Sequence, residues 1–178
     1  IQAFYKLDCP GPLCKDRLEP GRFEVDTFIW SEESSQPVTA VGVCTICGLE
    51  GEIELTPATL QTQGKTPSYS LIRTQVLERI AAQDPHLRRV MEEVVGFYSP
   101  RALISLQLLL NKIETSNLDE KQTKLLKALW LSAADQCNQL WIWPRARNRP
   151  RQLLRPPMYQ EANVWQAFVR GVNNWVHP

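Results

Sequence analysis

Cys9-Pro-Gly-Pro-Leu-Cys14 and Cys44-Thr-Ile-Cys47-Gly48 are the two stretches of sequence that decide the expected fold at the head of this chain. In each stretch a short turn can bring both sulfurs to one side, and the glycine after Cys47 permits a positive φ. Two such pairs supply the four thiolates of a tetrahedral zinc site without demanding much of the chain between them. The sequence therefore predicts one Zn²⁺ bound by Cys9, Cys14, Cys44 and Cys47.

Two other interpretations of these cysteines stay open. The pairs can be reduced thiols that lie close only in sequence. A redox role for Cys44 and Cys47 is less consistent with the pattern, because a helix should follow directly and the strand-like residues 52–55 follow instead. If all four thiolates bind zinc, the closed coordination leaves no position for an activated water, so the metal would support folding. Cys137 stands alone in a helical pattern, where it is expected to be a small buried apolar residue.

Composition places the chain among globular proteins. Its 178 residues are 43% hydrophobic and 22% charged, enough for one helical core plus a small metal-bound unit. No run approaches the roughly 20 apolar residues of a membrane helix, and the start lacks the features of a signal peptide. We therefore expect a cytoplasmic location and no membrane partner. Because the chain begins at Ile1 without a methionine, we also expect it to be part of a longer polypeptide.

The residue patterns change along the chain from short strands to helices. Residues 23–30 and 38–43 are rich in β-branched and aromatic residues, which predicts strands within a zinc-ribbon-like β unit over 1–56. Residues 57–67 are expected to be a linker. The remainder, 68–178, predicts a helical domain, so the expected class is α+β, mainly α: a small N-terminal β zinc ribbon followed by a bundle of about five helices.

The helical part carries local start signals. Asp84-Pro85 and Ser99-Pro100 each combine an N-cap residue with a proline at the first helical position. The expected helices cover, in order, residues 68–83, 86–95, 100–113, 119–140 and 161–176. Residues 144–159, between the last two, are interrupted by prolines and are expected to be an irregular, arginine-rich loop.

That loop holds the candidate nucleic-acid contacts. No acidic residue lies between Trp143 and Tyr159, although the net charge of the whole chain is only +1. Guanidinium groups match phosphate oxygens in pairs, and an indole ring can stack on an exposed base. DNA is therefore a possible partner. The alternative is a solvated loop whose cations pair with helix carboxylates. The candidate residues are Trp143, Arg145, Arg147, Arg149, Arg151 and Arg155.

A catalytic centre is not expected in this chain. The sequence has no phosphate-binding glycine loop, no nucleophile elbow and no paired histidines. Of its two histidines, His86 falls in the first turn of an expected helix and His177 at the end of the chain. We therefore expect a protein that binds, and whose own residues carry no reaction.

The order of features resembles the insert of large bacterial and archaeal DNA methyltransferases of the amino-methylating (N6-adenine or N4-cytosine) class. The resemblance rests on the paired cysteines, on Tyr98-Ser-Pro-Arg101 before a leucine-rich helix, on Pro157-Met-Tyr159 and on Asn163-Val-Trp-Gln-Ala-Phe168. It implies a non-catalytic part that helps the enzyme to grip or choose DNA, with other domains of the parent polypeptide as partners. S-adenosylmethionine would bind in those other parts, since residues 155–159 lack the acidic residue of the family's catalytic motif. The alternative is a zinc-stapled protein-interaction or scaffolding domain.

Overall fold

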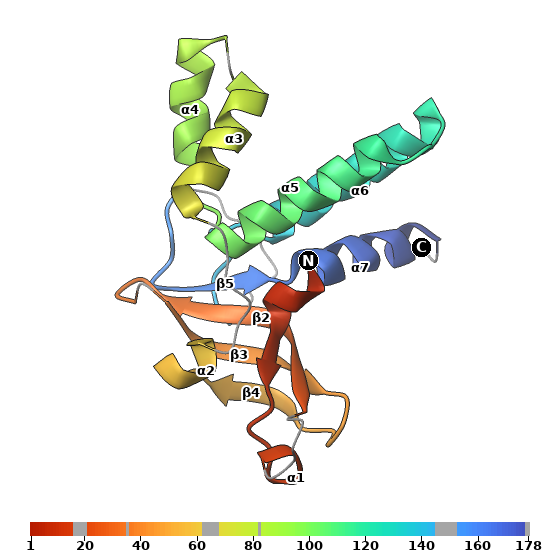
Figure 1. The fold of residues 1–178 in the computed structure, drawn as a ribbon. Coiled ribbons are helices and arrows are strands. Elements are labelled where there is room, and N and C mark those ends of the chain that lie inside the picture. Colours follow the sequence, from red (N-terminus) through yellow and green to blue (C-terminus); the bar gives the residue numbers. More distant parts are fainter. Residues whose placement is uncertain (16–20, 35, 62–67, 82, 145–152, 177–178) are drawn as a thin grey trace. The chain divides into compact units, whose positions relative to one another are not determined.

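The structure is a computed structural model that describes residues 1–15, 21–34, 36–61, 68–81, 83–144 and 153–176 (Figure 1). The chain divides into two compact units. The sheet unit contains the described residues within 2–65 and 140–163, and the helical unit contains those within 66–139 and 164–178. An antiparallel five-stranded sheet and a set of helices confirm the mixed α+β class.

The sheet has the strand order β1-β2-β3-β4, and β5 pairs with the remaining part of β2. All neighbouring strands are antiparallel. Irregularities in the β2–β3 register occur between Val25 and Thr27 and between Ile29 and Trp30. The strands are β1 (Lys6–Asp8), β2 (Arg22–Ser31), β3 (Pro37–Cys44), β4 (Glu50–Glu54) and β5 (Met158–Ala162).

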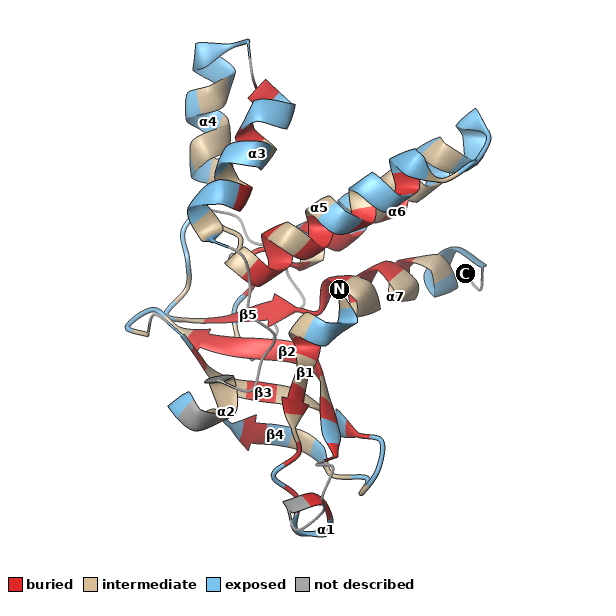
Figure 2. Cartoon of the chain, in the orientation of Figure 1, coloured by how far each residue is buried: buried red, intermediate tan, exposed pale blue. Residues whose placement is uncertain are grey.

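The central strand β2 organises the core of the sheet unit. Its β-branched and aromatic residues suit a pleated surface with neighbours on both sides, and Figure 2 shows most of the strand as buried. Phe23 and Phe28 are fully enclosed, and Tyr5 packs its ring 6.1 Å from that of Phe28. Tyr5 ends the 3₁₀ helix η1 (Gln2–Tyr5), which precedes β1.

Two short helices accompany the sheet. α1 (Pro12–Lys15) lies between β1 and β2, and α2 (Pro57–Gln61) follows β4. The second differs from the linker expected over 57–67. The Thr56 hydroxyl accepts a hydrogen bond from the backbone N–H of Thr59 at 3.2 Å, which caps the first turn of α2. Residues 62–67 of the expected linker lie outside the described residues.

Strand β5 corrects the expectation of an irregular segment up to residue 159 and a helix from about residue 161. It pairs with the second half of β2, in a register that sets Trp30 opposite Tyr159 and Phe28 opposite Glu161. The Trp30 and Tyr159 rings stack with centroids 6.1 Å apart. Residues 158–162 adopt an extended backbone because they pair with a strand some 130 positions earlier in the sequence. The local propensities of these residues do not indicate this pairing.

Asn163 closes this strand before the last helix begins. Its backbone N–H donates to the Asp26 carbonyl at 2.7 Å, and its side-chain amide donates to the Val25 carbonyl at 2.8 Å. Both bonds hold the strand end at the β2 irregularity. The last helix therefore starts at Val164, three residues later than expected.

The helical unit consists of five helices in the described residues, and each overlaps a range expected from the sequence, with ends that differ by up to four residues. Its core includes Ile72, Leu77, Val95 and Leu103, with Tyr69, Val76, Met91, Tyr98 and Ile104 packed against it. Helices α5 and α6 lie side by side, and α7 contacts both (Figure 1). The helices are α3 (Tyr69–Ala81), α4 (Pro85–Val95), α5 (Pro100–Thr115), α6 (Glu120–Gln136) and α7 (Val164–Val176).

The N-caps of α4 and α5 confirm the local helix signals, and α6 also begins with a cap. The Asp84 carboxylate accepts from the first N–H groups of α4, the Ser99 hydroxyl accepts from Ala102 N–H at 3.0 Å, and Asp119 forms a capping box with Gln122. Each cap satisfies donors that have no partner within the helix. No described helix has the length and apolar character needed to cross a membrane.

Candidate metal centre

The four predicted cysteines meet at one end of the sheet unit. Cys9 follows β1, Cys14 lies in α1, Cys44 ends β3 and Cys47 lies in the turn before β4. Their Sγ atoms all lie within 4.8 Å of one another. Two contacts join the sequence pairs: the Sγ atoms of Cys9 and Cys47 are 3.5 Å apart, and those of Cys14 and Cys44 are 3.8 Å apart. These four residues can hold a metal ion.

Strand pairing explains why residues so far apart in sequence converge. Leu7, Phe23 and Cys44 form one row across β1, β2 and β3, so the end of β3 lies beside the chain that leaves β1. Cys9 N–H donates to the Gly21 carbonyl at 2.7 Å, which ties the first cysteine loop to the start of β2.

The Cys44–Cys47 turn is closed by its own backbone. Cys44 N–H donates to the Leu49 carbonyl at 2.8 Å, and Gly48 N–H donates to the Cys44 carbonyl at 2.9 Å. Gly48 has a φ of +70°, a conformation that side chains with a Cβ rarely adopt. The glycine after the second cysteine pair therefore has the role expected from its position.

Two further glycines leave room for the sulfurs. A Cβ on Gly11 would lie 3.0 Å from Cys47 Sγ and 3.3 Å from Cys9 Sγ. A Cβ on Gly21 would overlap Cys14 Sγ and lie 3.2 Å from Cys44 Sγ. The backbone thus lies close to the sulfur cluster at both glycines, and at Gly21 a side chain would fit only if a sulfur or the backbone moved.

The spacing of the sulfurs fits a metal–thiolate tetrahedron. With metal–sulfur bonds of about 2.3 Å, the edges of a tetrahedron are about 3.8 Å long. Two of the sulfur separations, 3.5 and 3.8 Å, lie close to that value. Three of the ligands are buried and Cys47 is half-buried, so a bound ion would be largely shielded from water.

Burial raises the pKa of the buried thiols, whereas hydrogen bonds from backbone N–H groups lower it. Burial raises the pKa of Cys9 to about 12 and also raises the pKa of Cys14. At Cys44 burial is outweighed by backbone N–H groups of Cys47 and Ile46 that donate to the sulfur, and the pKa falls to about 7. In the metal-free cluster Cys9 and Cys14 therefore keep their protons at neutral pH, and a metal ion must displace them.

Of the six residues predicted to contact nucleic acid, the structure describes Trp143 and Arg155. Arg145, Arg147, Arg149 and Arg151 lie outside the described residues. Trp143 is half-buried, and its backbone N–H donates to the Met158 carbonyl at 3.0 Å, beside β5. Arg155 is exposed. Cys137 is fully buried at the C-cap of α6, in the helical unit, and is not a member of the four-cysteine cluster.

One buried carboxylate was not predicted from the sequence. Glu161 in β5 is 0% exposed, and the indole N–H of Trp30 donates to its Oε2 at 3.0 Å. In the sequence Glu161 looks like an ordinary surface residue. Its burial follows from the pairing of β5 with β2, which the sequence around Glu161 does not indicate.

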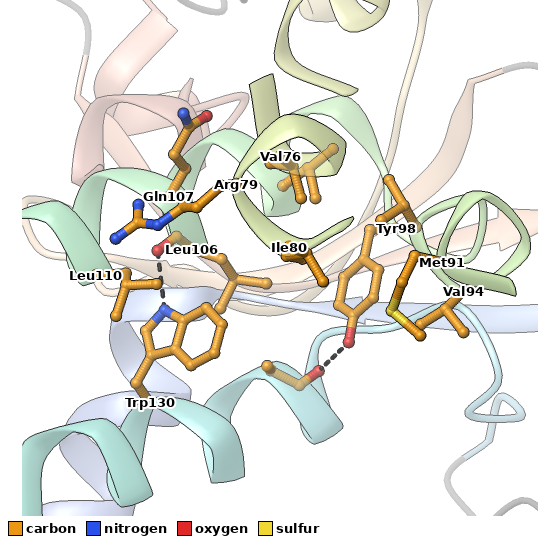
Figure 3. Close-up of a pocket in the computed structure, with 13 residues that line it drawn as sticks. Val76, Arg79, Ile80, Met91, Val94, Tyr98, Leu106, Gln107, Leu110 and Trp130 are labelled. Atoms are coloured by element: carbon orange, nitrogen blue, oxygen red, sulfur yellow. Dashed lines mark hydrogen bonds between the residues drawn. The ribbon is translucent and has the colours of Figure 1, made fainter. Parts of the chain in front are cut away.

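A cavity in the helical unit was also not expected. It has a volume of about 380 Å³ and a mainly apolar lining from α3 to α6, and includes Val76, Ile80, Met91 and Leu110 (Figure 3). Two polar groups in its wall already bond to backbone: Trp130 N–H to the Leu106 carbonyl at 2.8 Å, and Tyr98 O–H to the Ala134 carbonyl at 3.2 Å. The first bond joins α6 to α5, and the second joins the segment before α5 to α6.

Comparison of the chain with known protein families, with curated proteins and with solved structures finds no match.

Proposed function

We propose that Cys9, Cys14, Cys44 and Cys47 bind one structural Zn²⁺ that stabilises the sheet unit of a non-catalytic binding protein. The observation that carries this proposal is the convergence of all four Sγ atoms within 4.8 Å. Soft thiolate ligands in a tetrahedral arrangement favour zinc among the common divalent ions. With four protein ligands the ion has no open position for water, so it supports folding.

Zinc removal from the full chain tests this proposal. We expect one equivalent of zinc per chain, and a chelator should abolish the amide NMR signals of β1 to β4 while those of α3 to α6 persist. Cys44→Ser should have the same effect. Cys137→Ala is the matched control, because it removes a buried thiol outside the cluster and should leave zinc content unchanged. Full retention of the sheet signals without metal would contradict a structural role, and a disulfide in the isolated protein would favour redox chemistry.

The proposal extends to DNA as the partner. It is supported by the five arginines of residues 145–155, an interval without acidic residues, in a chain of net charge +1. The resemblance to the insert of amino-methylating DNA methyltransferases gives the same partner. In that setting the chain helps to hold or select DNA, and the cofactor and the reacting groups belong to other parts of the enzyme.

Salt-dependent DNA binding by the full chain tests this second part. Replacing Arg147, Arg149 and Arg151 with alanine should weaken binding to DNA of any sequence, because phosphate contacts release counterions whatever the bases. The slope of log affinity against log salt concentration should become less steep by about three. The control replaces three lysines of α5 and α6 with alanine: Lys112, Lys121 and Lys124. It changes the net charge by the same amount as the triple arginine variant. Equal binding by the wild type and the arginine variant at low salt eliminates the DNA proposal.

One observation favours the alternative of a protein-interaction module. The last turn of α7 exposes Trp175 by 53% and Val176 by 63%. Exposed aromatic residues of this size are common in protein interfaces. Under this alternative, Trp175→Ala abolishes association with other domains of the parent polypeptide, whereas the triple arginine variant retains it. If instead DNA binding is lost only in the triple arginine variant, the result supports the DNA-binding proposal.

A further inference from the structure

The strand β4 is the outermost strand of the sheet on one side (Figure 1). It pairs with β3 only, in the register Thr39–Glu54, Val41–Glu52 and Val43–Glu50. The outer side of β5 differs, because the preceding segment covers it: Trp143 N–H donates to Met158 and Gln160 N–H donates to Trp141, at 3.0 and 2.9 Å. Among the described residues, no such segment covers β4.

The direction of the β4 backbone groups follows from its ladder. Leu55 N–H donates to the Val38 carbonyl at 3.0 Å, and Cys44 N–H donates to the Leu49 carbonyl at 2.8 Å. Groups that bond to the partner strand alternate along an antiparallel ladder. The backbone N–H and C=O groups of the three glutamates, Glu50, Glu52 and Glu54, therefore point away from β3, towards the open edge.

The side chains of the same three glutamates share one face of the sheet. Ile53, between two of them, is buried on the opposite face, whereas Glu50, Glu52 and Glu54 are all exposed. Within the described part of the chain, none of the three carboxylates has a salt-bridge partner. The open edge thus carries a row of carboxylates with two-residue spacing beside its free backbone groups.

We propose that the β4 edge binds an extended, basic peptide segment of a partner protein by adding it to the sheet as a further strand. Backbone hydrogen bonds would supply the pairing, and lysine or arginine at alternate positions would lie beside the three carboxylates. A second copy of β4 is a poor occupant, because pairing would set glutamates against glutamates. DNA is excluded from this edge by the same negative charge.

The short edge limits what can be recognised. β4 has five residues, and Gly51 has a φ of +115°, which departs from regular strand geometry in the middle of the edge. The partner segment is therefore short, with its cations at every second position. A segment with the same composition but with its cations grouped together would place only some of them on the carboxylate face.

Binding of synthetic peptides to the zinc-loaded full chain tests the proposal. The probe is a short peptide with lysine at every second position and threonine between, followed by fluorescence anisotropy. We expect Glu52→Lys to weaken binding by about tenfold or more, since it replaces an attractive cross-strand pair with a repulsive one. The matched control is Glu33→Lys, which makes the same change of charge at an exposed residue outside the strands and should alter binding by about twofold at most.

Two peptide controls on the unaltered protein distinguish strand addition from simple attraction of charges. Methylation of the backbone nitrogens that face β4 should abolish binding, and grouping the lysines together should weaken it by about tenfold. The proposal is wrong if the methylated peptide and the peptide with grouped lysines bind as well as the alternating peptide. It is also wrong if the protein variants Glu52→Lys and Glu33→Lys lose affinity for the alternating peptide equally. No binding of the alternating peptide at low salt would also overturn it.

Discussion

Replacement of Gly21 by alanine should disrupt the metal centre without removing any ligand. Gly21 precedes β2, and its carbonyl accepts from Cys9 N–H at 2.7 Å. An added Cβ would overlap Cys14 Sγ and lie 3.2 Å from Cys44 Sγ. The new methyl group therefore forces two of the four sulfurs, or the backbone between them, to move.

The size of the effect follows from the packing. Insertion of a methyl group into a tightly packed site destabilises it by about 1–3 kcal/mol. If that strain falls on the metal-bound state, zinc affinity decreases by about fivefold to over a hundredfold, because each 1.4 kcal/mol is a factor of ten. Competition with a chromophoric chelator measures this change directly.

The control is a glycine-to-alanine change of the same size away from the sulfurs. Gly171 lies in α7, where an added Cβ would meet Leu129 Cδ2 at 3.3 Å, a contact with the end of a flexible side chain. Gly171→Ala should leave zinc affinity unchanged. An unchanged zinc affinity in Gly21→Ala as well would refute the packing around the four sulfurs described above.

Three further predictions concern pH, buried polar contacts and helix caps. Because burial raises the pKa of Cys9 to about 12 and also raises that of Cys14, zinc affinity should increase with pH, and calorimetry at pH 8 in two buffers should detect at least two protons released per ion; a pH-independent affinity would exclude thiolate ligands. Trp30→Phe removes the donor to buried Glu161 and should lower the free energy of unfolding by about 2 kcal/mol in urea titrations, so an unchanged midpoint would show that the bond contributes nothing. Asp119→Ala removes the capping box of α6 and should lower the stability of the helical unit by about 1 kcal/mol, measured by hydrogen exchange in α6.

Features that depend on local chemistry could be predicted from the sequence. The spacing of the cysteine pairs identified all four members of the cluster, because the members of each pair are close in sequence and the pairing of β1, β2 and β3 has only to bring the two pairs together. Asp84-Pro85 and Ser99-Pro100 marked the starts of α4 and α5, since an N-cap acts on the next three residues alone.

Features that depend on distant pairing could not be predicted. Residues 158–162 form a strand because β2 offers an unpaired edge, and that edge is some 130 residues away in the sequence. Glu161 becomes buried for the same reason. The importance of Gly21 is also invisible in the sequence, because it follows from the approach of two sulfurs that belong to other segments.

X-ray absorption at the zinc edge of the full chain tests the central claim most directly. If the four cysteines form one closed site, the spectrum should show four sulfur ligands at about 2.3 Å and no nitrogen or oxygen ligand. A first shell with fewer than four sulfurs, or with a water oxygen, would contradict the closed structural site.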